Sequence, residues 1–273
     1  GATETYHGIA NTAIGSKALY ANSTGFYNSA VGSGALTSNT TGSYNAANGT
    51  GALLTNTTGD ANTSSGFNSM IGNVSGNGNI AYGAGALTSN SAGNSNSAAG
   101  TNSLFNNQSG NSNVAVGVAA LYNTGNRSNL AAVGDSALYN NGVGAVNPYE
   151  ATANSAFGSK ALYANTTGYY NTATGSNALK NNTTGIQNTA NGTGALFTNT
   201  TGGANTATGL NALFQNSTGN NNTAVGNFTL TNNSSGNNNT GTGTGALSTN
   251  TTGNNNTAAG TGSLFSNTTG YSN

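Results

Sequence analysis

The chain has 273 residues with four Lys or Arg, four Asp or Glu, one His and no Cys, so its formal net charge is zero. Leu, Ile, Val and Phe together fall below the roughly 20% of a chain that an ordinary globular core requires. Four scattered basic residues cannot neutralise the phosphate backbone of a nucleic acid. No apolar run reaches the ~18 residues of a membrane span, and the lack of Cys excludes disulfides. A chain with so little charge has little repulsion between copies, which favours association.

A 17-residue period organises the chain. Glycine recurs at this spacing from Gly15 to Gly134 and again from Gly158 to Gly260. Four residues after each of these glycines stands a leucine, replaced once by Met70. The period is too short for helical repeats, and the abundant Gly, Asn and Thr disfavour helix. The pattern predicts an all-β parallel β-solenoid or β-roll of about 15 coils, a rod roughly 70 Å long at ~4.8 Å per coil.

Each coil is expected to contain two short extended pieces, such as NTAVG at 222–226 and GALFT at 194–198. Asn, Thr and Gly between them form corners, where Asn can bond the local backbone and stack in ladders from coil to coil. The recurrent glycines allow close approach of the backbone. We predict that the glycine and leucine columns form the structural core, including Gly15, Leu19, Gly32, Leu36, Gly175, Leu179, Gly192, Leu196, Gly209 and Leu213.

A longer repeat is also visible, because the segment 16–28 matches the segment 159–171 almost letter for letter, at an offset of 143. The chain is interpreted as one solenoid segment, 1–273, with a super-repeat over 1–143 and a partial second copy over 144–273. Between Gly134 and Gly158 the spacing grows to 24, and the extra residues predict a loop near 142–153 that contains the only proline. We expect the chain to be a piece of something longer.

Three units, NTAIGSKAL (11–19), NSAVGSGAL (28–36) and NTAVGNFTL (222–230), resemble the head repeats of trimeric autotransporter adhesins and similar repeats in bacterial and phage fibre proteins. The resemblance implies left-handed parallel β-rolls, three chains side by side, on extracellular stalks that bind host or environmental surfaces. The chain differs from that family in its 17-residue unit, which is longer than usual and has NTTG as an apparent extra corner.

The sequence contains few side chains that could act as catalytic acids, bases or nucleophiles. His7 is the only histidine, and the four acids are Glu4, Asp60, Asp135 and Glu150, which suggest no acid–base pair or triad. Two Asp cannot supply calcium-binding repeats. We therefore predict no enzyme, and no catalytic, cofactor-binding or metal site. A polysaccharide-active β-helix enzyme is disfavoured by the lack of carboxylates.

The Thr pairs of the NTTG corners are expected to line up along one edge of the solenoid, as a surface array that could order water as ice-binding proteins do. A second interpretation is that Thr simply suits extended and corner backbone. The array comprises Thr40, Thr41, Thr57, Thr58, Thr166, Thr167, Thr183, Thr184, Thr200 and Thr201.

Two further columns have alternative interpretations. The corner asparagines Asn22, Asn39, Asn56 and Asn165 form N-x-S/T sequons, which indicate glycosylation or arise automatically in an Asn/Thr-rich repeat. The residue after the repeated leucine is often aromatic, and it either packs against a neighbouring chain or caps the chain's own core.

The resulting hypothesis is a non-enzymatic structural or adhesive segment of an extracellular or cell-surface fibre, filament or adhesin that uses no cofactor. It would act through a repeated multivalent surface. Its expected partners are further copies of itself, as a homotrimer or filament, and a cell or environmental surface, with no nucleic acid and no membrane span in the segment. The alternative is an ice-binding β-solenoid that uses the Thr columns.

Overall fold

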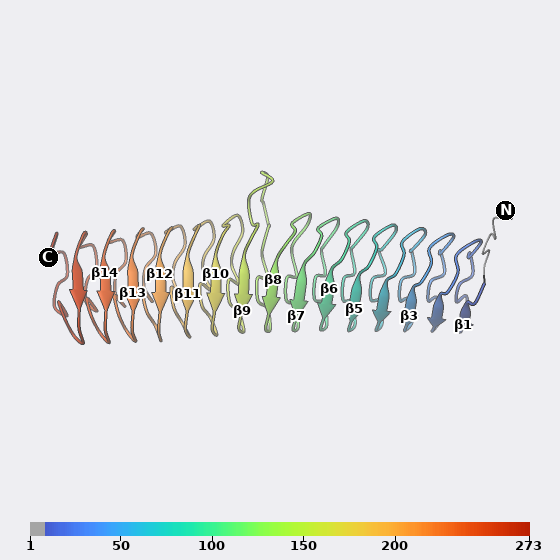
Figure 1. The fold of residues 1–273 in the computed structure, drawn as a ribbon, viewed down its shortest axis with the longest axis horizontal. Helices are drawn as coiled ribbons and strands as arrows, with labels where there is room; N and C mark the ends of the chain where they lie inside the picture. Colours follow the sequence, from blue (N-terminus) through green and yellow to red (C-terminus); the bar gives the residue numbers. More distant parts are fainter. Residues whose placement is uncertain (1–8) are drawn as a thin grey trace, which may run out of the picture. The chain divides into compact units, whose positions relative to one another are not determined.

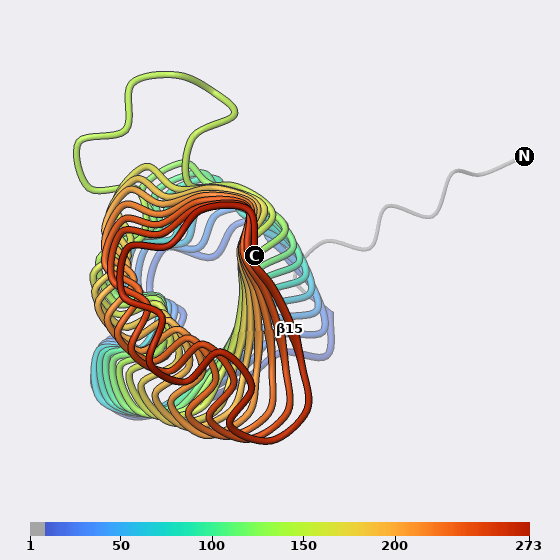
Figure 2. The ribbon, with the colours of Figure 1, turned by 90° about the vertical axis from the view of Figure 1, so that its left-hand side faces the viewer.

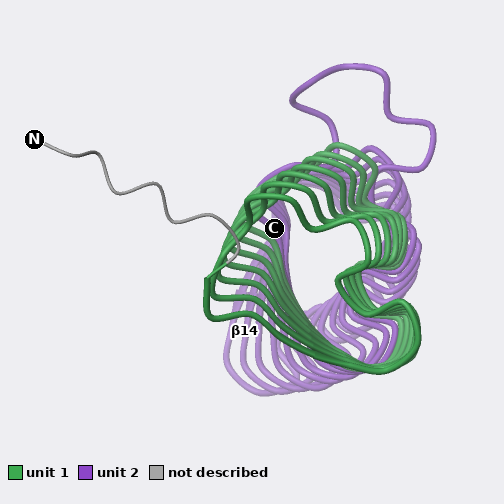
Figure 3. Ribbon diagram, turned by 90° about the vertical axis from the view of Figure 1, so that its right-hand side faces the viewer, with its two compact units in different colours: residues 1–129 green, residues 130–273 purple. Residues whose placement is uncertain are grey.

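The computed structural model describes residues 9–273, and Glu4 and His7 lie outside the described part. The chain consists of two compact units, which are coloured separately in Figure 3. Unit 1 is Gly1–Asn129 and unit 2 is Leu130–Asn273. In both units the chain winds into coils with one short parallel strand per turn, and the described residues contain no helix (Figure 1). The predicted all-β parallel solenoid is therefore confirmed.

Residues 9–273 contain fifteen strands of three residues each. In unit 1 they are β1 (Thr12–Ile14), β2 (Ser29–Val31), β3 (Ala46–Asn48), β4 (Thr63–Ser65), β5 (Ile80–Tyr82), β6 (Ser97–Ala99) and β7 (Val114–Val116). In unit 2 they are β8 (Ala131–Val133), β9 (Ser155–Phe157), β10 (Thr172–Thr174), β11 (Thr189–Asn191), β12 (Thr206–Thr208), β13 (Thr223–Val225), β14 (Thr240–Thr242) and β15 (Thr257–Ala259).

Within each unit, neighbouring strands pair in parallel and in register. Thr172 of β10 lies beside Thr189 of β11, and Ser29 of β2 lies beside Ala46 of β3. Each coil therefore repeats the side-chain positions of the coil before it. In Figure 2 the successive coils of unit 2 are turned gradually about the stacking direction, as the normal twist of strands requires.

Only one of the two expected extended pieces in each coil is a strand. Residues 194–198 form a turn, in which Leu196 has a φ of +53°, and the equivalent Leu36 has +51°. This left-handed backbone interrupts a strand and costs a non-glycine residue about 1–3 kcal/mol. Both leucine side chains are fully buried, which contributes about 1.5–3 kcal/mol each and offsets that cost. The prediction of a second extended piece was wrong because packing outweighs backbone preference there.

The interior of most coils holds one leucine and two small residues beside the asparagines, and Met70 replaces the leucine in one coil. Leu36, Leu179, Leu196 and Leu213 are fully buried, whereas Leu19, in the first described coil, is half-buried. The glycine four residues before each leucine lies where coils touch. At Gly32, φ is +132°, and an added Cβ would lie 2.6 Å from the carbonyl carbon of Gly49. The same contact recurs from coil to coil at Gly15, Gly175, Gly192 and Gly209.

Asparagine forms two ladders inside the solenoid. In the corner ladder, Asn39 Nδ2 donates to Asn22 Oδ1 at 2.8 Å and to the carbonyl of Gly42 at 2.8 Å. In the strand-entry ladder, Asn28 Oδ1 accepts from the backbone N–H of Asn45 at 2.9 Å. No buried side-chain N or O in residues 9–273 lacks a hydrogen-bond partner. The narrow core is thus stabilised by polar ladders as well as by leucine.

The extra residues of unit 2 leave the solenoid between β8 and β9 as a projecting loop (Figure 1). The corner ladder continues across it, because Asn165 Nδ2 donates to Asn141 Oδ1 at 2.9 Å. Asn141 Nδ2 in turn donates to the carbonyl of Ala151 at 2.8 Å. Inside the loop, the Glu150 carboxylate accepts from the backbone N–H groups of Val146 and Asn147. The segment 142–153 therefore replaces part of one corner and leaves the ladder intact.

Candidate interaction surfaces

Charged side chains are dispersed over the described part of the chain. Among residues 9–273, no three His, Asp or Glu side chains lie close enough together to hold a metal ion. Glu150 holds the loop together, and Lys180 Nζ lies 5.2 Å from the ring centroid of Phe197. The remaining features that could bind a partner are repeated, uncharged surfaces.

The first threonine of each NTTG corner has its hydroxyl engaged within the protein. Thr40 Oγ1 donates to the carbonyl of Thr57 at 3.0 Å, and Thr183 Oγ1 donates to the carbonyl of Thr200 at 3.0 Å. The same bond is made by Thr57, Thr166 and Thr200 toward the next coil. These hydroxyls stabilise coil stacking, so they cannot also donate to a lattice of external water.

The second corner threonine faces outward. Thr41, Thr58, Thr184 and Thr201 are exposed, and Thr167 is half-exposed. The predicted paired array is thus reduced to a single row, because one Thr of each pair serves the backbone. The ice-binding hypothesis requires a flat surface of exposed threonines at these corners, and a row one residue wide does not provide it.

The sequon asparagines are part of the corner ladder. Asn39, Asn56 and Asn165 are completely buried, and Asn22 is half-buried. Both Nδ2 hydrogens of Asn165 are donated, one to Asn141 Oδ1 and one to the carbonyl of Gly168, each at 2.9 Å. A glycan on such a nitrogen is incompatible with the folded coil, because it would remove a buried ladder bond and has no space.

The aromatic column after the leucine stacks along the chain. Phe105 and Tyr122 have ring centroids 4.9 Å apart with an interplanar angle of 1°, and Phe197 and Phe214 are also 4.9 Å apart. These rings therefore contact one another between coils, an arrangement typical of offset aromatic pairs. Packing of this column against another chain stays a proposal.

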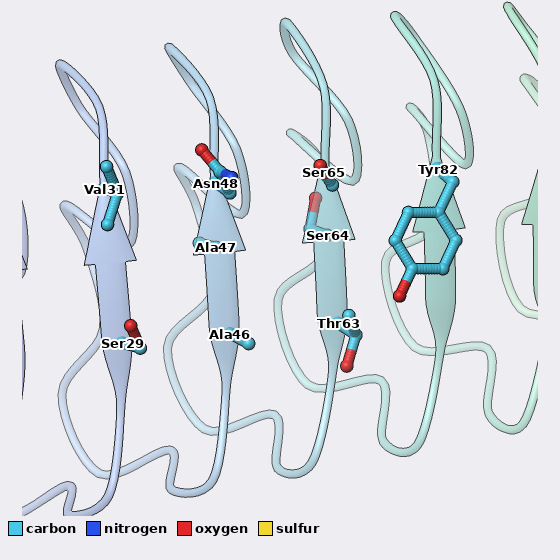
Figure 4. Close-up of a pocket in the computed structure, with 9 residues that line it drawn as sticks. All are labelled: Ser29, Val31, Ala46, Ala47, Asn48, Thr63, Ser64, Ser65 and Tyr82. Carbon is cyan, nitrogen blue, oxygen red and sulfur yellow. The ribbon is translucent and has the colours of Figure 1, made fainter.

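The sheet face of unit 1 is irregular and largely apolar. Ile80 and Tyr82 of β5 are 41% and 51% exposed, and Val114 and Val116 of β7 are 42% and 43% exposed. Beside the Tyr82 ring, β2 to β4 carry small side chains and leave a shallow hollow of about 270 Å³ (Figure 4). Exposed apolar side chains gathered on one face are typical of interaction surfaces.

The sheet face of unit 2 is different, and sequence analysis missed it. The first residue of each strand from β10 to β15 is threonine, its side chain outward, and the middle residue is buried. The signal was present as T-x-T at 172–174, 206–208 and 240–242, directly before the periodic glycines. We call Thr172, Thr189, Thr206, Thr223, Thr240 and Thr257 the strand Thr column.

Comparisons with known proteins give no relative: no family model, no curated protein and no solved structure matches this chain. In the described residues no helix is long and apolar enough to cross a membrane. The functional argument therefore depends on the surfaces of the two units.

Proposed function

We propose that this chain is a non-enzymatic structural and adhesive segment of an extracellular or cell-surface fibre, filament or adhesin. The observation that carries the proposal is the apolar sheet face of unit 1, where Ile80, Tyr82, Val114 and Val116 are exposed on a chain with almost no charge. Burying such side chains against a partner contributes roughly 25 cal/mol per Å² of apolar surface.

The coil architecture supports a multivalent mode of action. Each coil places its outward residues in register with those of the next, so weak contacts made by different coils of the unit lie on one face. Several weak contacts on one rigid scaffold give an overall affinity far above that of each contact. The occupants that fit are further copies of this chain, as a trimer or filament, and an apolar patch on a cell or environmental surface.

The test is the solution mass of the whole chain by light scattering coupled to size exclusion. We expect an oligomer, and we expect Ile80→Lys with Val114→Lys to lower the mass toward that of the monomer. The matched control is Thr223→Lys with Thr257→Lys, which changes the equivalent positions in the second copy of the super-repeat and should leave the mass unchanged. A wild-type monomer that binds no hydrophobic bead or cell surface would refute the proposal.

A further inference from the structure

The strand Thr column is a regular array on a rigid support. Thr172 pairs in register with Thr189, Thr189 with Thr206, and the register continues through Thr223 and Thr240 to Thr257. Neighbours along the column are therefore about 4.8 Å apart, and a second outward position on the same strand lies about 6.7 Å away. This second position alternates, with Thr174, Thr208 and Thr242 in every other strand and Asn191, Val225 and Ala259 between them.

The hydroxyls of the strand Thr column have no partner within the described part of the protein. All six side chains are exposed or half-exposed, and within unit 2 none makes a side-chain hydrogen bond to another protein group. This distinguishes them from the corner threonines, such as Thr200, whose hydroxyl donates to the carbonyl of Ser217 at 3.0 Å. The free hydroxyls are available to water.

The column is also held rigidly. β-branched side chains have a restricted χ1 angle, so methyl and hydroxyl groups point in repeated directions. Beneath them, Ala173, Ala190, Ala207 and Ala224 are completely buried, and the backbone N–H of Gly192 donates to the carbonyl of Thr174 at 2.8 Å. An ordered array avoids part of the entropy cost of binding an ordered ligand.

No charged residue occurs in β10–β15. Charged groups bind water strongly in their own hydration shells, whereas methyl and hydroxyl groups can share one hydrogen-bonded layer of water. A ligand that repeats in two dimensions with the spacing of neighbouring strands, and offers a donor or acceptor at every repeat, is a crystal surface. We propose that the strand Thr column and the adjacent Thr174, Thr208 and Thr242 form an ice-binding face.

This inference goes beyond the adhesive function and uses the strands of unit 2 in place of those of unit 1, so either proposal can fail alone. The test uses the whole chain and measures freezing hysteresis and the shape of a single ice crystal. We expect hysteresis and faceted crystals, and at least a tenfold loss of hysteresis for Thr206→Lys with Thr223→Lys. The matched control, Thr63→Lys with Ile80→Lys, changes the equivalent positions of unit 1 and should lose less than twofold.

Folding is checked by circular dichroism on each variant. If the lysine variant of unit 2 unfolds, Thr206→Ser with Thr223→Ser decides the question, because it keeps the hydroxyl and removes the methyl group and the χ1 restriction. We expect at least a threefold loss of hysteresis for this variant. Round ice crystals without hysteresis for the wild type, or equal losses in the unit 1 and unit 2 variants, would overturn the proposal.

Discussion

The strands β2–β7 of unit 1 and β10–β15 of unit 2 occupy equivalent coils in the two copies of the super-repeat. Their interiors are almost the same, with fully buried leucines such as Leu36 and Leu179 at equivalent places. Their outward faces differ. The first residues of strands β2–β7 are Ser, Ala, Thr, Ile, Ser and Val, whereas the first residue of each strand β10–β15 is Thr.

The comparison shows which residues the scaffold constrains. Inside the coil, the two asparagine ladders and the glycine contacts leave little freedom, because most of these groups touch the equivalent group of the next coil. In residues 9–273 the ladder asparagine is replaced only by Thr124 and Leu130, which are both buried. On the outer face, hydrogen bonding within the sheet uses only the backbone, so side chains can change without loss of stacking. A solenoid can therefore carry two chemically different faces on one repeated interior.

The largest expected effect is a change to the shared interior. Gly32→Val and the equivalent Gly175→Val place a Cβ 2.6 Å from a backbone carbon of the next coil, at φ near +130°. We expect each to lower the free energy of unfolding by roughly 3 kcal/mol or more. Urea unfolding followed by circular dichroism measures both. A clear loss in one unit with no loss in the other would show that the interiors are not equivalent.

Removing a rung of the corner ladder should have the next largest effect. Asn39→Ala removes the acceptor of one buried N–H of Asn56, and Asn182→Ala removes that of Asn199. Each variant should cost about 2 kcal/mol, because a buried donor is left unpaired. The controls are Thr41→Ala and Thr184→Ala, exposed residues of the same corners, with effects of about 0.5 kcal/mol or less. Thermal unfolding of all four variants measures their losses of stability. Equal losses in the Asn→Ala variants and the Thr→Ala controls would show that the corner ladder does not stabilise the coil.

Converting one face into the other tests the comparison directly. Threonine introduced at Ser29, Ala46, Ile80, Ser97 and Val114 gives unit 1 a column of its own together with Thr63. We expect the free energy of unfolding to change by less than about 1 kcal/mol, because β-branched residues suit exposed strands. Self-association should fall and freezing hysteresis should rise about twofold. Association that stays unchanged would show that the apolar face of unit 1 is not the contact surface.

The smallest effect is expected from the loop of unit 2. Replacing residues 142–151 with Thr-Thr-Gly restores an ordinary corner and keeps the ladder bond from Asn165 Nδ2 to Asn141 Oδ1. Shortening a surface loop changes the closure entropy by less than about 1 kcal/mol. We expect unchanged circular dichroism, association and hysteresis. Loss of folding in this variant would mean that the loop contributes to unit 2 more than its corner contacts indicate.

The sequence predicted the solenoid because the evidence for it is a regular spacing of residues along the chain. A glycine in each 17-residue repeat, followed by a leucine at a fixed offset, determines the coil length and the parallel stacking. These features depend on spacing along the chain alone. By contrast, the turn at Leu196 was predicted as an extended piece, because local preference gives no indication of a leucine at positive φ.

Only the tertiary structure decided which polar side chains point inward. The corner Asn39 is buried in a ladder, the neighbouring Thr40 donates to the next coil, and the strand threonines such as Thr206 are free. All three are small polar residues with similar local preferences. Their roles differ because several residues of each coil, such as Tyr27 and Leu36, have a positive φ and set the path of the coil. Those turns are stabilised by packing of one coil on the next.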